Sequence, residues 1–139
     1  MQIKHTDPSA LRHELGQLAK EVSRLSEVFT RRAPLWAGNV YVLRRRCGKP
    51  TCHCAKGELH AATVLADRSG AVRRTVPLRG ADVDFFQPMT KAYGRFRDAR
   101  ARLTKIHKRM LQIIDLLGEA RLAEGRQKEK KRHEERSPP

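Results

Sequence analysis

LRHELGQLAKEVSRLSEVF, residues 11–29, carries an apolar side chain at alternating steps of four and three residues. These side chains are Leu11, Leu15, Leu18, Val22, Leu25 and Phe29. Such spacing puts them on one stripe of an α-helix, the seam through which coiled coils and helical hairpins pack. Thr6 or Asp7 can cap this helix, and Pro8 suits its first turn. We therefore predict a helix over residues 6–30.

A second apolar stripe runs through the C-terminal half of the chain. Its members are again spaced by three and four residues: Phe96, Ala99, Leu103, Ile106, Met110, Ile113 and Leu117. Pro88 favours a helix start near Asp84, because the first four N–H groups of a helix have no intrahelical partner. We predict a helix over residues 84–124 that packs antiparallel to the first one. The charged tail, residues 126–139, has few apolar residues and is expected to pass from frayed helix into disorder.

The segment between these helices is rich in β-forming residues. GNVYVLRRR (38–46) alternates as a short strand does. AATVLAD (61–67) and AVRRTVPL (71–78) predict a β-hairpin, with Gly70 supplying a positive φ in its turn. Residues 38–80 therefore form a small module of about three strands. The predicted fold class is α+β, mainly α: an antiparallel coiled-coil hairpin of two long helices, with this module between them in the chain.

All three cysteines of the chain lie within CGKPTCHC, residues 47–54. Cys47, Cys52 and Cys54 together with His60 supply three thiolates and one imidazole, a complete tetrahedral shell for zinc. His53 is the alternative fourth ligand, but it stands between two cysteines and tends to point away from an ion that both bind. A shell of four protein ligands has no open position, so the predicted zinc is structural.

Other uses of clustered cysteines are a redox dithiol or an iron–sulfur cluster. Histidine ligation is a minority pattern in iron–sulfur proteins. A nucleophile built from Cys52 or Cys54 with His53 is conceivable, but metal ligation would consume these thiolates. We find no paired carboxylates, phosphate-binding glycine loop or nucleophile–base pair, and we predict no catalytic residues and no enzyme activity.

RRRCGKPTCHCAKGELH, residues 44–60, resembles the loop of a small uncharacterised prokaryotic domain family with the pattern RCGK-P-x-C-x-C-x-x-G-x-x-H-G-P. The matching positions are Arg46, Cys47, Gly48, Lys49, Pro50, Cys52, Cys54, Gly57 and His60. Ala61 and Ala62 stand where the family commonly has Gly–Pro. The resemblance covers about residues 40–110. Its variable residue at His53 favours His60 as the ligand, and the frequent association of the family with mobile elements implies a role in DNA transactions.

The charge of the chain favours a polyanionic partner. Lysine and arginine number 30 against 15 acidic residues, a net charge of +15, which is typical of proteins that bind nucleic acid. The candidate contacts are Arg44, Arg45, Arg46, Lys49, Lys56, Arg73, Arg74, Arg95, Arg97, Arg100, Arg102 and Lys105. Aromatic residues are only 5% of the chain, which favours contact with the phosphate backbone over stacking on single-stranded bases. We expect DNA as the partner ahead of RNA.

Partner proteins are also indicated. Leu111, Ile114 and Leu116 widen the apolar face of the second helix beyond a two-helix seam, which favours a homodimer. The alternative to nucleic-acid binding is an adaptor whose heptad helices bind a larger protein of the same complex. No apolar run is long enough to span a bilayer and no signal peptide is recognisable. We predict a cytoplasmic protein without a membrane partner, associated with the nucleoid if it binds DNA.

Overall fold

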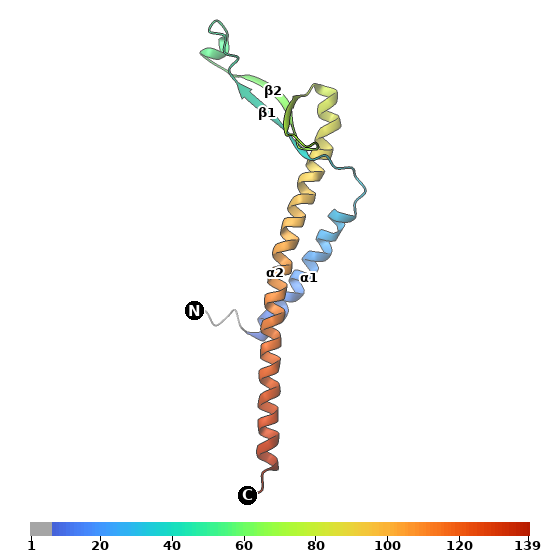
Figure 1. Cartoon of the computed structure of the whole chain (residues 1–139), viewed down its shortest axis with the longest axis vertical. Helices are drawn as coiled ribbons and strands as arrows, with labels where there is room; N and C mark the ends of the chain where they lie inside the picture. The colour runs from blue at the N-terminus through green and yellow to red at the C-terminus, as the bar shows by residue number, and fades with distance from the viewer. Residues whose placement is uncertain (1–6) are drawn as a thin grey trace. The chain divides into compact units, whose positions relative to one another are not determined.

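The computed structural model describes residues 7–139, so the predicted cap Thr6 lies outside the described residues. The elements follow one another as α1 (Pro8–Thr30), β1 (Gly38–Arg45), the short 3₁₀ helix η2 (His53–Ala55), β2 (His60–Asp67), β3 (Arg74–Pro77) and α2 (Gly80–Arg136) (Figure 1). This order confirms the mainly α, α+β fold. The described chain forms two compact units, residues 7–29 with 99–139 and residues 30–98.

The helical unit pairs α1 with the later part of α2 (Figure 1). Its buried side chains are Leu11, Ala99, Ile106 and Ile113, all members of the two predicted stripes. In α2 these residues repeat every seven positions, so they occupy one line of the helix surface. The seam anticipated from the heptads is therefore the core of this unit.

Two ion pairs fix the direction and register of the two helices. Arg102 donates from Nε and Nη2 to Glu21 at 2.6 and 2.8 Å, and Arg109 donates in the same way to Glu14 at 2.7 and 2.8 Å. The two glutamates are one heptad apart on α1, and their partners are one heptad apart on α2 in the reverse order. The helices are therefore antiparallel.

The ends of the helices depend on local chemistry. Asp7 Oδ1 accepts a hydrogen bond from the Ser9 backbone N–H at 3.2 Å and caps α1. α2 begins at Gly80, earlier than the predicted start near Asp84, so that Pro88 lies inside the helix. The proline removes a single backbone donor, and the helix continues on both sides of it.

The C-terminal end of α2 corrects the expected disorder of residues 126–139. The helix continues to Arg136. Glu, Lys and Arg have high helix propensity, and Arg132 forms an i,i+3 ion pair with Glu129 at 3.6 Å. The charge and low hydropathy of this segment therefore indicated correctly that it is exposed. They did not indicate that it remains helical.

Three antiparallel strands form the sheet of the second unit in the order β1-β2-β3. Asn39 pairs with Ala66, and Ala66 pairs with Thr75 on the other side. β3 is shorter than the predicted 71–78, which leaves a loop over residues 68–73. The predicted positive φ of Gly70 is wrong, since Gly48 alone among the described glycines has one.

Trp36 connects the sheet to the first turns of α2 within this unit. Its backbone N–H donates to the Met89 carbonyl at 3.2 Å, and its ring meets the Phe86 ring edge-on with centroids 5.0 Å apart. Leu65 is buried in the neighbouring sheet. Gly38 is required here, because a Cβ at this position would lie 2.5 Å from the Ala66 carbonyl oxygen. No helix within residues 7–139 combines the length and apolar character needed to cross a membrane.

Candidate metal centre

The candidate metal centre lies in the loop between β1 and β2, at the far end of the ribbon that these two strands form (Figure 1). Arg45, the last residue of β1, pairs with His60, the first residue of β2. Cys47 follows two residues after Arg45. The strand register therefore brings the first and last predicted ligands to the same end of the ribbon, although thirteen positions separate them in the sequence.

Tight turns fold the rest of the loop back over these two residues. Gly48 adopts φ of +83°, a conformation that favours glycine. The Cys52 N–H donates to the Lys49 carbonyl at 3.1 Å, and η2 continues this turn through Cys54. The result is a compact loop that returns two cysteines toward Cys47.

Four predicted ligand atoms converge in this loop. The sulfur atoms of Cys47 and Cys54 lie 3.5 Å apart, and the Cys52 sulfur lies 3.1 Å from His60 Nε2. All four ligand atoms are within 4.8 Å of one another. His53 Nδ1 lies at the longer distance of 3.8 Å from the Cys52 sulfur. The group that the structure gathers is therefore Cys47, Cys52, Cys54 and His60.

This geometry fits a tetrahedral metal ion. Zinc binds thiolate sulfur at about 2.3 Å and imidazole nitrogen at about 2.0 Å, so its ligand atoms are separated by roughly 3.5–3.8 Å. The cluster differs from these separations by at most about 1 Å. Cys54 is 1% exposed, and the Cys47 N–H donates to its sulfur at 3.4 Å. The group can hold a metal ion such as zinc and would enclose it from several sides.

The thiols respond differently to their surroundings. The backbone N–H of Cys54 and then the His60 ring lower the pKa of Cys52 from its ordinary value near 9 to about 6. At Cys54 the backbone N–H of Cys47 favours the thiolate, but burial and the neighbouring sulfur atoms outweigh it and raise the pKa. Because a metal binds the thiolate form, Cys52 is prepared for ligation and Cys54 has to lose its proton to bind the ion.

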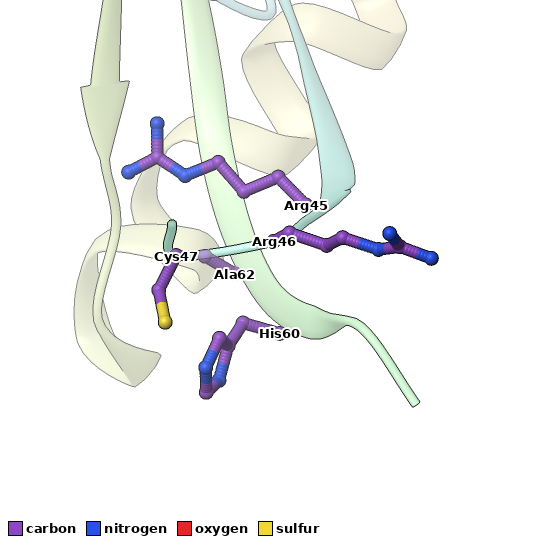
Figure 2. Close-up of a pocket in the computed structure, with 5 residues that line it drawn as sticks. All are labelled: Arg45, Arg46, Cys47, His60 and Ala62. Atoms are coloured by element: carbon purple, nitrogen blue, oxygen red, sulfur yellow. The ribbon is translucent and has the colours of Figure 1, made fainter. Parts of the chain in front are cut away.

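An open hollow of about 570 Å³ adjoins the cluster and is lined by Arg45, Arg46, Cys47, His60 and Ala62. Figure 2 shows the Cys47 sulfur directed toward the His60 ring, while the Arg45 and Arg46 side chains extend in opposite directions. Both arginines are exposed. Because successive side chains of an extended chain point to opposite sides, Arg45 and Arg46 place their positive charges on two sides of the loop.

The other predicted cationic residues fall into three groups. Arg44, Lys49 and Lys56 are exposed and lie on β1 or in the cysteine loop. Three have a carboxylate or aromatic partner: Arg74 binds Asp67, Arg102 binds Glu21, and Arg97 lies 5.9 Å from the Tyr93 ring centroid. Exposed Arg73 and Arg95 belong to the sheet unit, whereas exposed Arg100 and Lys105 belong to the helical unit.

Sequence reasoning missed Asp67, a carboxylate that is only 3% exposed. Its Oδ1 accepts hydrogen bonds from the Ser69 N–H at 2.9 Å, from the Ser69 hydroxyl and from Trp36 Nε1 at 3.1 Å. The Ser69 hydroxyl, the Ser69 N–H, Trp36 and Arg74 together lower the pKa of Asp67 to about 2. An aspartate at a strand end with serine two residues later is typical of an Asx turn, and this signal could have found it.

Comparison of the chain with protein-family models, with curated proteins and with solved structures finds no match in any of the three. The resemblance noted in the sequence therefore rests on the residues of the cysteine loop alone.

Proposed function

We propose that this chain is a non-catalytic, zinc-stabilised protein that binds nucleic acid, DNA in preference to RNA. The observation that carries the proposal is the position of Arg45 and Arg46 beside the four-ligand cluster, where both line one hollow with Cys47 and His60. In this proposal zinc fixes the loop, and the fixed loop holds the arginines against phosphates. The resemblance of the loop to a family associated with mobile elements supports a role as an accessory factor of a larger nucleoprotein complex.

Electrostatics support this division of roles. Three thiolates and one zinc ion carry a net charge of minus one, which the cations around the loop more than balance. Arginine offers paired donors that match phosphate oxygens. The four protein ligands leave no open coordination position, so the proposed ion has a structural role and does not activate water.

The aromatic residues support backbone contact over base stacking. Trp36 packs edge-on against Phe86 and donates its Nε1–H to Asp67, and the Tyr93 ring faces Arg97. Tyr41 on β1 is 37% exposed and Phe85 on α2 is 61% exposed. Two rings on separate elements offer little platform for a row of stacked bases, which favours a duplex partner.

A salt series tests this proposal. Fluorescence anisotropy with a labelled duplex gives the binding constant at each salt concentration. The logarithm of this constant should fall linearly with the logarithm of the salt concentration, with a slope of about −0.9 for each phosphate contacted. Arg45→Ala/Arg46→Ala should lower both the affinity and the slope. Arg31→Ala/Arg32→Ala, which removes the same charge from exposed positions before β1, is the matched control. Binding that ignores salt, or no binding of the parent protein at low salt, would refute the proposal, while equal affinity for duplex RNA would remove the DNA preference.

An interaction adaptor is the second candidate, because α2 keeps an exposed apolar stripe. Leu111, Ile114 and Leu122 are 62%, 49% and 65% exposed and recur at a helical spacing. A second copy of the chain or a larger protein could cover them. Light scattering would detect the homodimer, and a stoichiometric partner that survives nuclease treatment in a pull-down would favour the adaptor over nucleic-acid binding.

A further inference from the structure

A second basic hollow lies at the end of the sheet opposite the cysteine loop. It is open, has a volume of about 410 Å³ and is lined by Asn39, Ala66, Asp67, Arg68, Arg73, Arg74 and Thr75. Asn39 and Arg45 are six positions apart on β1, about 20 Å along an extended strand. All of the lining residues belong to the sheet unit. This hollow is therefore separate from the metal centre.

Asp67 holds one of the arginines in place. Its Oδ2 accepts a hydrogen bond from Nε of Arg74 at 3.2 Å and forms an ion pair with Nη2 at the same distance. The Asp67 side chain is 3% exposed, whereas that of Arg74 is 70% exposed. The carboxylate thus binds one edge of the guanidinium from inside the sheet. Because most of the Arg74 side chain is exposed, a ligand can still reach the guanidinium.

The charges around the hollow favour an anion. Three guanidinium groups face one carboxylate, and that carboxylate already accepts hydrogen bonds from Trp36, Ser69 and Arg74. Asn39 and Thr75, which pair with Ala66 from its two sides, also line the hollow and carry no charge. Arginine pairs and neutral donors are the groups that bind phosphate oxygens, whereas a cation would meet net positive charge.

We infer that this hollow is a phosphodiester-binding subsite, in which Arg68, Arg73 and Arg74 contact the backbone of a nucleic acid and Asp67 positions Arg74. The inference rests on the proposed function and deepens it. The open form of the hollow suits a polymer backbone that passes across it. Arg68, Asn39 and Thr75 are new to the predicted contact set, and Asp67 is a positioning residue rather than a ligand.

The test uses the full chain and a labelled DNA duplex. For each phosphate that the protein no longer neutralises, Arg68→Ala/Arg73→Ala should reduce affinity by about eightfold at about 0.1 M salt and flatten the salt slope by about 0.9. Arg31→Ala/Arg32→Ala again removes equal charge from the same unit and should leave the slope unchanged. Circular dichroism and metal content should match the parent protein in both double variants.

Two conservative variants test the positioning role. Arg74→Lys keeps the positive charge but loses the contacts of Nε and Nη2 with Asp67. Asp67→Asn keeps an oxygen acceptor for Ser69 and Trp36 but loses the negative charge that holds Arg74. Both variants should weaken duplex binding severalfold. The slope of affinity against salt should change little, because the other arginines still contact phosphates. Arg31→Lys should have no effect.

The outcomes separate the inference from the proposed function. If the parent protein does not bind the duplex, the proposed function fails. If it binds but Arg68→Ala/Arg73→Ala behaves like the control, the subsite is wrong while the proposed function stands. Inorganic phosphate, titrated at constant ionic strength against the arginine side-chain NMR signals, distinguishes the ligand source: tight binding of phosphate without an effect of the duplex would overturn the phosphodiester assignment.

Discussion

Two adjacent isoleucines on α2 give a sharp test of the helical core. Ile113 is fully buried, with 0% of its surface exposed, whereas Ile114 is 49% exposed. Replacement of either by alanine removes the same three carbon atoms, worth about 2.4 kcal/mol of transfer free energy at about 0.8 kcal/mol each. At Ile113 a cavity is added to this loss, and buried Ile→Ala changes cost about 2–5 kcal/mol. At Ile114 half of the side chain already contacts water, so the expected cost is about 1 kcal/mol.

Urea unfolding of the two variants, followed by the helical circular dichroism signal, measures this difference. For a slope of about 1–3 kcal/mol per molar urea, Ile113→Ala should lower the midpoint at least twice as far as Ile114→Ala. Equal midpoints would refute the assignment of the seam to Ile113. A loss at Ile114 that shrinks as the protein is diluted would show instead that another copy of the chain covers the exposed stripe.

Three further predictions concern charge and backbone fit. The Asp67 carboxyl has a pKa of about 2 in the fold, against its ordinary value of 3.8. The charged carboxylate therefore stabilises the fold fully above about pH 4, and this contribution is lost as the pH falls toward 2. In acid unfolding followed by the fluorescence of the single tryptophan, the stability of Asp67→Asn should fall less steeply with pH than that of the parent protein. Gly38→Ala places a Cβ 2.5 Å from a carbonyl oxygen of the neighbouring strand. It should lower the free energy of unfolding, measured by thermal denaturation, by about 1–3 kcal/mol. Gly70→Ala, whose added Cβ has nothing within 4 Å, should leave the free energy of unfolding unchanged. Glu21→Arg should lower the urea midpoint by repulsion from Arg102, and the added change Arg102→Glu should restore it; no rescue by the second change would contradict the antiparallel register.

The helices could be predicted from the sequence because their core repeats locally. Leu11, Ile106 and Ile113 are buried at positions that the heptad spacing picked out. The end of α2 at Arg136 was missed, because net charge and low hydropathy report exposure, whereas the helix depends on propensity. Composition alone therefore could not distinguish an exposed helix from a disordered tail.

The cysteine loop could also be predicted, since its ligands are close in sequence and of diagnostic types. His60 was favoured because His53 stands between two cysteines, and the structure gathers His60 with the three cysteines. The ion pair between Asp67 and Arg74 could not be predicted in the same way. Its strength depends on burial of the carboxylate and on contact with Trp36, a residue 31 positions away that only the folded sheet brings near.

In the proposed function, Cys47, Cys52, Cys54 and His60 form one structural zinc site. Native mass spectrometry of the full chain, purified without added metal, tests it most directly. We expect one zinc ion per chain in the parent protein and in His53→Ala, and loss of that zinc in Cys54→Ser and His60→Ala. A chain that carries no metal, that carries an iron–sulfur cluster, or that keeps its zinc in His60→Ala but loses it in His53→Ala would contradict this assignment of the ligands.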